Sequence, residues 1–391
     1  MKSPAGIVGA LFTSSLGLPG MPDLLAAELP EESLDYRFTR YDENALPKSK
    51  LLAGDPSRYE IDSHQLRWVK NLDKSYTLTV GYLHEAMSGS SPWYVIPSSA
   101  GQSLQVMSGA TIREKRDQLD VSVSRLGESI THTLGAGYST EDDYQAIYGS
   151  YSGKKESADA LTTYNWGFSY SDDELNPTDA VAFGRIIAAS KDIKSASVGL
   201  SQVINRNAVI QAGATLTHHS GFLSDPYKLV LVGPQVLPDQ RPDERTLFSV
   251  STRFRQYIES SRAALQLDYR YFRDSWEIQA HTLDIAYVQP FGSAWELTPS
   301  LRYHAQKAPD FYAPYFLEIP QYGYWSSDYR LATFGALSYR LDVSWKNSRL
   351  RVSAGLEIYD SEEGLSVFGD PQDTPGLVDF WRASLALKIT L

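Results

Sequence analysis

Few residues of this sequence of 391 amino acids have the types and the spacing that chemistry requires. His84 and Glu85 form half of the HExxH motif of zinc peptidases, but no second histidine follows at the required spacing. His218 and His219 are adjacent, and adjacent residues on a strand point to opposite faces, which argues against a shared metal ion. The absence of cysteine excludes disulfides, iron–sulfur ligation and thiol nucleophiles. We therefore predict that the protein uses no metal and no cofactor.

Hydrolytic chemistry also has little support. The sequence contains no GxSxG motif and no Ser–His–acid arrangement, and His132 and His281 fall in segments with the pattern of ordinary strands. Acidic clusters at residues 141–143, 172–174 and 362–363 fall in predicted connections, where their carboxylates could bind calcium or form a solvated acidic rim. We favour the solvated rim and predict that the protein is not an enzyme.

The strongest functional lead is a set of charged residues that alternate with apolar ones. The set consists of Asp120, Arg253, Arg255, Asp268, Arg270, Arg302, Arg351 and Glu357. If the alternation places them on the inner wall of a barrel, they could form rings of charge that select ions. The same residues could instead pair across the lumen and close it, and the sequence leaves both interpretations open.

The alternation that positions these charges recurs along the chain. In the stretch AALQLDYRYF, residues 263–272, Gln266, Asp268 and Arg270 alternate with leucines and tyrosines. A period of two is the pattern of a β-strand. We count about sixteen such segments of roughly ten residues each, and an even number of strands of that length is typical of membrane barrels. The sequence therefore predicts an all-β fold.

Short and long connections alternate as well. The stretches NLDK, LGES, INRN, IESS and WKNS are short turns, whereas residues 225–244 and 308–328 belong to long loops. Short periplasmic turns and long extracellular loops are the pattern of bacterial outer-membrane barrels. This alternation predicts that both termini lie on the periplasmic side.

The apolar side of the strands is predicted to face lipid. On that side Arg or Lys would cost about 2–4 kcal/mol at the bilayer midplane, whereas charges on a polar lumen cost little. We therefore assign Leu267 and Val352 to lipid, and Asp268 and Arg351 to the lumen. A soluble β-sandwich or propeller is the alternative, but no repeat of fixed period is present. The formal net charge of -11 argues against nucleic acid as a partner, because phosphate requires a basic surface.

The N-terminus has the pattern of a secretory signal. Lys2 precedes a mostly apolar run, and Leu25-Ala26-Ala27 offers a cleavage site before an acidic segment. We predict a signal peptide at residues 1–27 and a single outer-membrane β-barrel domain at residues 28–391.

One long connection is predicted to narrow the barrel. The segment from Ser88 to Thr111 is rich in Ser and Gly and contains two prolines, so it is a loop and not a spanning helix. Because it is nearly uncharged, it could fold into the lumen as a constriction, with a mobile surface loop as the alternative. The candidate constriction residues are Trp93, Tyr94, Val95 and Ile96.

Stretches along most of the chain point to one family. They include MSGSSPW, MSGATIREKRDQLDVSVSR, GYSTEDDY, SYSDDELNPTD, SGFLSDPYK, YRYFRDSWEIQAHTLDIAYVQPF and SSDYRLATFGA. In these stretches, from about Leu34 to the C-terminus, the sequence resembles the bacterial outer-membrane family catalogued as a domain of unknown function, DUF3570. The resemblance implies a transmembrane antiparallel up-and-down β-barrel in the outer membrane of a Gram-negative bacterium. Such proteins look to be encoded beside flavin-attachment and thioredoxin-like genes, which implies an extracytoplasmic redox setting. The family carries no established activity, so no catalytic residues transfer.

Three functions compete at this point. The first is a porin-like, weakly anion-selective channel for small solutes, because inward arginines outnumber inward acids between Arg253 and Glu357. The second is a non-conducting barrel that scaffolds a periplasmic or extracellular redox partner. The third, least favoured, is an outer-membrane lipid-modifying enzyme. In each case outer-membrane lipid and lipopolysaccharide are expected to surround the barrel, and the oligomeric state is left open.

Overall fold

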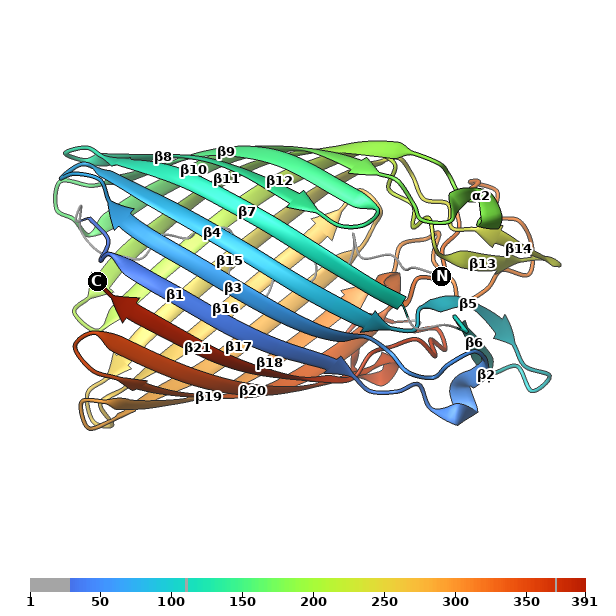
Figure 1. Cartoon of the computed structure of the whole chain (residues 1–391). Helices are drawn as coiled ribbons and strands as arrows, with labels where there is room; N and C mark the ends of the chain where they lie inside the picture. Colours follow the sequence, from blue (N-terminus) through green and yellow to red (C-terminus); the bar gives the residue numbers. More distant parts are fainter. Residues whose placement is uncertain (1–28, 110–111, 370) are drawn as a thin grey trace.

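The structure is a computed structural model that describes residues 29–109, 112–369 and 371–391. Within these ranges sixteen strands form one closed antiparallel barrel, seen from the side in Figure 1. The barrel strands are β1 (Ser33–Glu43), β3 (Glu60–Asn71), β4 (Tyr76–Gly89), β7 (Ile112–Leu126), β8 (Ile130–Thr140), β9 (Tyr144–Glu156), β10 (Thr162–Leu175), β11 (Ala189–Asn205), β12 (Ala208–Gly221), β15 (Glu244–Ile258), β16 (Ala263–Asp274), β17 (Gln279–Phe291), β18 (Trp295–Lys307), β19 (Phe334–Lys346), β20 (Leu350–Glu362) and β21 (Phe380–Thr390).

Each barrel strand pairs with the barrel strands that precede and follow it along the chain, and the first and last strands pair with each other to close the sheet. β1 pairs with β3 on one side and with β21 on the other, from Ser33 opposite Thr390 to Glu43 opposite Phe380. Closure leaves no strand edge with unpaired backbone groups, which a sheet in lipid requires. The prediction of an up-and-down barrel of about sixteen strands is confirmed.

The two ends of the barrel differ. At one end, here called the turn rim, connections are as short as residues 206–207. At the other end, the loop rim, they include the long segments 222–243 and 308–333. The C-terminus lies at the turn rim, where the Leu391 backbone N–H donates to the Glu32 carbonyl at 2.9 Å (Figure 1).

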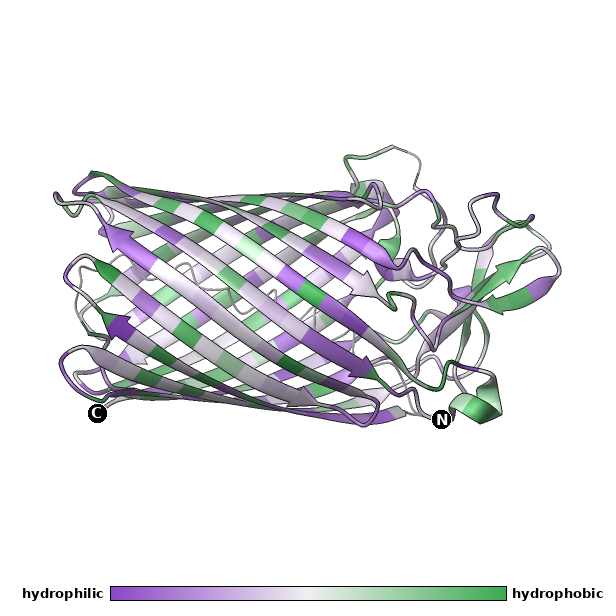
Figure 2. Ribbon diagram, turned by 90° about the horizontal axis from the view of Figure 1, so that it is seen from above, coloured by the Kyte–Doolittle hydropathy of each residue, from purple (hydrophilic) through white to green (hydrophobic). Residues whose placement is uncertain are grey.

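The strands have an apolar outer face and a polar inner face. On β16, Tyr269 points outward and is 43% exposed, whereas its neighbour Asp268 forms ion pairs on the inner side. The same outward exposure is found at Leu119, Val121, Leu134, Val198, Leu216, Phe248, Leu301, Leu356 and Ile358. Figure 2 shows the alternation as green and purple bands along the strands. Lipid covers such an apolar outer face in transmembrane barrels.

Helix is scarce in the described residues. The α-helix α2 (Ala180–Phe183) has four residues, and three short 3-10 helices, η1 (Lys48–Lys50), η2 (Tyr329–Leu331) and η3 (Glu363–Leu365), lie in loop-rim connections. None of the helices in the described part of the chain is long and apolar enough to cross a membrane.

Loop-rim segments interlock in a structure that we call the cap. It consists of residues 44–59, 90–109, 222–243, 308–333, 363–369 and 371–379. It contains a three-stranded sheet of β2 (Leu51–Ala53), β6 (Ser103–Met107) and β5 (Pro92–Pro97), and a hairpin of β13 (Leu229–Val232) and β14 (Gln235–Pro238). In Figure 1 these elements lie beyond the loop-rim end of the barrel strands. A buried apolar cluster under the cap includes Trp276, Ile278, Tyr312, Leu331 and Ala332.

The segment predicted as a constriction is placed differently from the expectation. Trp93, Tyr94, Val95 and Ile96 form most of β5, which pairs with β6 in the cap sheet rather than folding between the barrel strands (Figure 1). Val95 is almost fully buried there. The apolar side chains that suggested a constriction therefore belong to a small sheet of the cap, in which Val95 is buried and the other three are partly exposed. The predicted signal peptide lies outside the described residues.

Candidate functional site

The inner wall of the barrel has two unlike halves. On β8 to β12, the inward positions carry mainly glycine and small hydroxyl residues, among them Thr131, Thr133, Gly135, Gly137, Thr163, Gly167, Ser169, Ser195, Ser197 and Gly199. The Tyr148 ring lies so close to Gly137 that a methyl group there would overlap it. The Tyr148 hydroxyl donates to the carboxylate of Asp120, which also accepts from Gln118 at 2.8 Å. This half is polar and carries few charges.

The opposite half, from β15 through β21, carries most of the predicted lumen charges. Asp268 accepts two hydrogen bonds from Arg255, one of them at 2.9 Å, and lies 3.8 Å from Arg253. The Arg302 guanidinium donates to Asp284 at 2.8 Å. Acids and arginines on neighbouring strands of this half thus form ion pairs with one another.

The remaining predicted residues follow the same arrangement. Glu357 on β20 accepts hydrogen bonds from Arg382 and from the Ser338 hydroxyl. Arg351, near the turn rim, lies 3.9 Å from Glu296. All eight predicted residues sit on the strand faces opposite the exposed apolar side chains. The pair of Arg382 and Glu357 joins neighbouring strands, whereas Arg351 and Glu296 lie on β20 and β18, with β19 between them.

Several of these charges keep contact with water. The side chains of Arg302 and Arg351 are 38% and 41% exposed, and that of Asp268 is 36% exposed. Ion pairs that plugged the lumen would be shielded from solvent on all sides. The charged wall is therefore solvated at Asp268 and Arg302 and, near the turn rim, at Arg351, whereas Glu357 is buried in its pair with Arg382.

Some inward arginines have no acidic partner. Among the described residues, Arg37, Arg67 and Arg270 form no ion pair. Arg270 lies near the ring of Phe272, with 5.9 Å between the guanidinium carbon and the ring centroid. Arg270 lies on β16, and Arg37 and Arg67 lie on the adjoining strands β1 and β3. Because positive charge is left over, the lumen potential along these strands is positive, although the chain as a whole is acidic.

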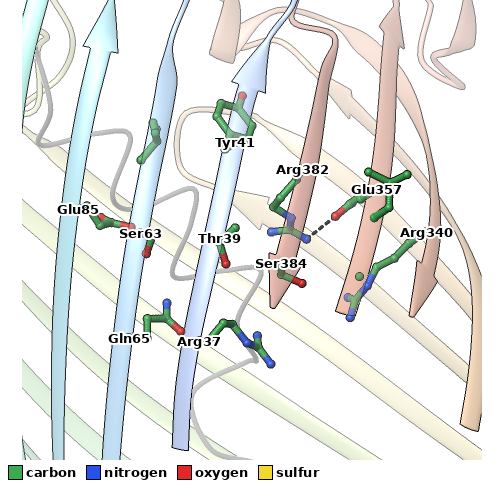
Figure 3. Close-up of a pocket in the computed structure, with 13 residues that line it drawn as sticks. Arg37, Thr39, Tyr41, Ser63, Gln65, Glu85, Arg340, Glu357, Arg382 and Ser384 are labelled. Carbon is green, nitrogen blue, oxygen red and sulfur yellow. Dashed lines mark hydrogen bonds and ion pairs between the residues drawn. The ribbon is translucent and has the colours of Figure 1, made fainter. Parts of the chain in front are cut away.

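Three arginines converge at a small cavity on the wall. The cavity has a volume of about 50 Å³ and lies between β1, β3, β20 and β21. In Figure 3, Arg37, Arg340 and Arg382 extend into the same region from separate strands, and Glu357 pairs with Arg382. Arg340 is paired with Asp342 at 2.6 Å, so Arg37 is the arginine of the three without an acid among the described residues.

The cap is held by buried ion pairs between distant segments. Asp328 accepts from Arg330 at 2.8 Å and from Arg241 at 2.9 Å. Arg330 also donates to Asp225 at 2.8 Å, and Arg241 lies 2.7 Å from Asp239. Burial acts to raise the pKa of Asp328, but the Arg330 and Arg241 guanidiniums outweigh it and hold the pKa well below its usual range. We call these five residues the cap ion network.

Two further cations tie segments of the cap to one another and to the end of β1. Arg58 and Lys228 lie over the Tyr329 ring at 5.1 and 5.2 Å from its centroid. Arg58 also donates to Glu43 at the end of β1 at 2.8 Å. Lys228 donates to the Pro92 carbonyl at 2.7 Å, and burial lowers its pKa to about 8. Segments from four loops are therefore fixed to one another above the loop rim.

The histidines and acidic clusters of the sequence analysis also have definite places. His84 points outward and contacts Asp117 at 2.9 Å between Nδ1 and Oδ1. His218 contacts the Thr246 hydroxyl at 3.0 Å, whereas His219 is on the inner face. Over the described residues, no group of three His, Asp or Glu has an arrangement that could hold a metal ion.

The prediction of a solvated acidic rim is wrong for three of its members. Glu141, Asp143 and Asp173 are buried. Asp173 lies within β10, where it accepts hydrogen bonds from the hydroxyls of Tyr144 and Ser171. The Asp143 carboxylate accepts a hydrogen bond from the Tyr227 hydroxyl. Tyr227 of the cap lies against Asp143, whereas Glu141 and Asp173 lie beside the strand residues Arg116 and Lys191.

The cap ion network was missed by sequence reasoning. Asp225, Asp239, Arg241, Asp328 and Arg330 lie in long loops without periodicity. In the sequence of a loop, a charged residue that is buried in an ion pair cannot be distinguished from one that is exposed to solvent. The one available signal was the density of charges beside prolines and aromatic residues in these loops.

Comparison with known proteins identifies a family and a general fold resemblance. A family model described as a protein of unknown function (DUF3570) matches residues 8–375. No curated protein matches the sequence.

Solved structures with similar folds are only remotely related. The siderophore receptor PirA from Pseudomonas aeruginosa is 12% identical with a TM-score of 0.43, and the match covers 85% of this chain and 56% of the receptor. A bacterial polysaccharide outer membrane secretin is 11% identical with a TM-score of 0.46, covering 94% of this chain and 100% of that one. The TodX monoaromatic hydrocarbon channel is 10% identical with a TM-score of 0.43, covering 92% and 90%. The chain spans about half the length of the siderophore receptors that it matches, and these similarities say nothing of what it binds.

Proposed function

The chain belongs to the DUF3570 family of proteins of unknown function, and we propose that it is an outer-membrane channel for small solutes with a weak preference for anions. In this proposal the apolar outer face contacts lipid and lipopolysaccharide of the bacterial outer membrane. The long loops lie outside the cell and the short turns in the periplasm. In this proposal the protein lets small solutes pass and catalyses no reaction.

One observation carries the proposal. Part of the charged wall is solvated, and Arg270 on β16, together with Arg37 and Arg67 on the adjoining strands β1 and β3, forms no ion pair with a described residue. A wall with excess positive charge in a low-dielectric surround raises the local concentration of anions. The preference is expected to be weak because most other arginines of this half are paired with Asp or Glu.

The cap favours a second candidate, a non-conducting scaffold. Buried ion pairs and hydrogen bonds in the cap join four loops above the end of the barrel. A barrel that does not conduct would need such a closure. A channel with this cap would conduct only when the cap opens or where solutes pass beside it. The two candidates therefore differ in whether loosening the cap increases conductance.

Planar-bilayer conductance under a salt gradient tests the channel. We expect a reversal potential of anionic sign, and larger conductance when residues 229–238 are replaced by a short Gly-Ser linker. Arg37→Gln together with Arg270→Gln should move the reversal potential toward zero. Arg206→Gln is the matched control, because Arg206 is an exposed arginine at the turn rim.

Two results would contradict the channel. A reversal potential of cationic sign in the intact protein would refute the anion preference. Silence from both the intact and the linker-replaced protein, each shown to be folded in the bilayer, would refute conduction and support the scaffold.

A further inference from the structure

A second cavity lies between the cap and the inner wall of the neutral half. It has a volume of about 180 Å³ and is lined by strand residues, by residues of shorter loops such as Asp143 and Trp276, and by the cap residues Phe222, Leu223, Ser224, Pro226, Tyr227 and Arg241. A cavity of about 150 Å³ is known to accommodate one benzene molecule, so this one has room for a single substituted ring. It is separate from the arginine cavity of Figure 3, with which it shares no lining residue.

The cap segment that covers the cavity is held in place by its own backbone. Gly221 has a φ of +110°, which L side chains rarely adopt, and a methyl group there would overlap the Ser190 carbonyl. The Phe222 backbone N–H donates to that same carbonyl at 2.9 Å. The chain therefore leaves β12 in a fixed direction and places Phe222 and Leu223 against the cavity.

Three adjacent strands each contribute a basic side chain to the cavity. His219 on β12 is directly opposite Arg245 on β15, and Ile193 on β11 is directly opposite His219. Lys191, two residues before Ile193, is therefore on the same inner face as His219. The three side chains line one cavity at one height of the barrel.

These basic groups differ in their remaining hydrogen-bonding capacity. Arg245 is committed to Asp274, to which its Nε donates at 2.8 Å. Lys191 Nζ is 3.7 Å from Asp173, which leaves donors of the ammonium group available. His219 has no hydrogen-bond partner among the described residues. Arg241, which also lines the cavity, is committed to Asp328 and Asp239, so Lys191 and His219 are the groups that could receive a ligand.

Aromatic rings supply the apolar part of the lining. Arg245 lies over the Trp276 ring at 4.4 Å, and Lys191 lies 4.8 Å from the Tyr144 ring centroid. The Trp276 Nε1–H donates to the Glu244 carbonyl at 3.0 Å, so its ring is fixed. A flat ring fits such walls better than a bulky aliphatic group.

The lining contains one acid. Asp143 is the only Asp or Glu among the lining residues that the structure describes, and its carboxylate accepts from the Tyr227 hydroxyl. Burial raises the pKa of Asp143. Lys191, His219 and Arg245 therefore face a single acid across the cavity, while Asp173 and Asp274 accompany Lys191 and Arg245 outside its lining.

We propose that this cavity binds a small aromatic carboxylate, with the carboxylate at Lys191 and His219 and the ring among Trp276, Tyr144 and Phe222. The combination of volume, basic row and fixed rings selects this class over neutral rings and over larger anions. The inference does not depend on conduction, because a closed barrel would hold the same cavity.

Binding is tested on the detergent-solubilised full chain with 4-fluorobenzoate observed by fluorine NMR. We expect saturable broadening beyond that caused by empty micelles. Benzoate should displace the probe, whereas benzamide, which is isosteric but uncharged, should compete at least about tenfold less well. Cyclohexanecarboxylate, which keeps the charge without the flat ring, should also compete less well than benzoate.

A matched pair of variants assigns the site. Lys191→Gln should weaken binding about tenfold or more, since it removes a charge-assisted hydrogen bond. Asp173 would keep its hydrogen bonds from Tyr144 and Ser171. Lys194→Gln, on the outward face of the same strand, should bind as the unmodified protein does.

Three outcomes would overturn the proposal. They are a folded unmodified protein without saturable binding, benzamide competing as well as benzoate, and equal binding by the Lys191→Gln and Lys194→Gln variants. The competition series uses the unmodified protein, so it decides the matter even if a variant does not fold.

Discussion

Replacing Asp328 by alanine should loosen the cap while leaving the barrel intact. The Asp328 carboxylate is buried and accepts from Arg330 at 2.8 Å and from Arg241 at 2.9 Å. Removing one partner of a buried ion pair typically costs about 3–5 kcal/mol, because the other charge is left buried. Here Arg330 retains Asp225 and Arg241 retains Asp239, so we expect the lower end of that range, about 3 kcal/mol.

The consequence can be measured as exposure of the cap to protease. A loss of about 3 kcal/mol confined to the cap raises the population of its open form roughly 100-fold, because each 1.4 kcal/mol is a factor of ten. Limited proteolysis of the purified protein should therefore cut faster within residues 222–243 and 308–333. The barrel strands should remain uncut, since the cap ion network contributes no barrel strand pair.

A matched control removes an ion pair that is exposed. Glu259 accepts from Arg206 at 2.8 Å at the turn rim, and both side chains are more than half exposed. Glu259→Ala should change stability by at most about 1 kcal/mol and leave the cap cleavage rate unchanged. Equal cleavage rates for the two variants would refute the view that Asp328 holds the cap, and cleavage within the barrel strands of Asp328→Ala would show that cap and barrel unfold together.

Three further predictions concern the wall, the pH dependence and the orientation. Leu267→Arg should lower the free energy of folding into lipid vesicles by about 2–4 kcal/mol, as measured by urea titration. Asp268→Ser, at a partly exposed lumen position, should cost about 1 kcal/mol or less in the same titration. Equal losses would indicate a dry core on both faces of the sheet. Burial raises the pKa of Glu141 to about 8 from an ordinary value near 4.5, so the folded state binds a proton that the unfolded chain has lost and stability falls between those pH values. Glu141→Gln should therefore match the unmodified protein in heat stability at pH 4 and exceed it at pH 8, whereas lower stability at pH 8 would mean that the contact with Arg116 at 3.8 Å prevails. Protease added to intact cells should cut within 225–244 or 308–328, and cuts restricted to 204–207 or 345–348 would reverse the proposed orientation.

The barrel was predictable from sequence because its determinants are local. Each strand alternates by itself, as AALQLDYRYF does, and the connection lengths alternate between the rims. In an up-and-down barrel the pairing partner of a strand is its neighbour along the chain, so strand order follows directly. The inward position of charges such as Asp268 and Arg302 follows from the same period of two.

The cap was not predictable because its contacts are long-range and lack a pattern. Arg330 reaches Asp225 across 105 positions, and Arg241 reaches Asp328 across 87. For the same reason Asp143 looked solvated, since nothing beside it in sequence indicates that Tyr227 lies against it. Asp173 looked solvated because its partners Tyr144 and Lys191 lie on the two neighbouring strands. The segment from Trp93 to Ile96 was predicted to be a constriction because an apolar loop segment is expected to be buried. The sequence does not show which element the segment packs against.

Selectivity and closure are assigned to different parts of this molecule. The wall arginines without acids, such as Arg37 and Arg270, belong to barrel strands, where strand pairing fixes their positions. The cap ion network has three acids and two arginines, with Lys228 close to Asp328, so its charges nearly balance and the closed cap adds little field of its own. In the proposed channel, cap variants should therefore change how often the barrel conducts and wall variants should change which ions pass. If cap variants shifted the reversal potential as much as wall variants, the selective element would lie in the cap. The unpaired arginines would then be hydrated by water in the lumen without selecting ions.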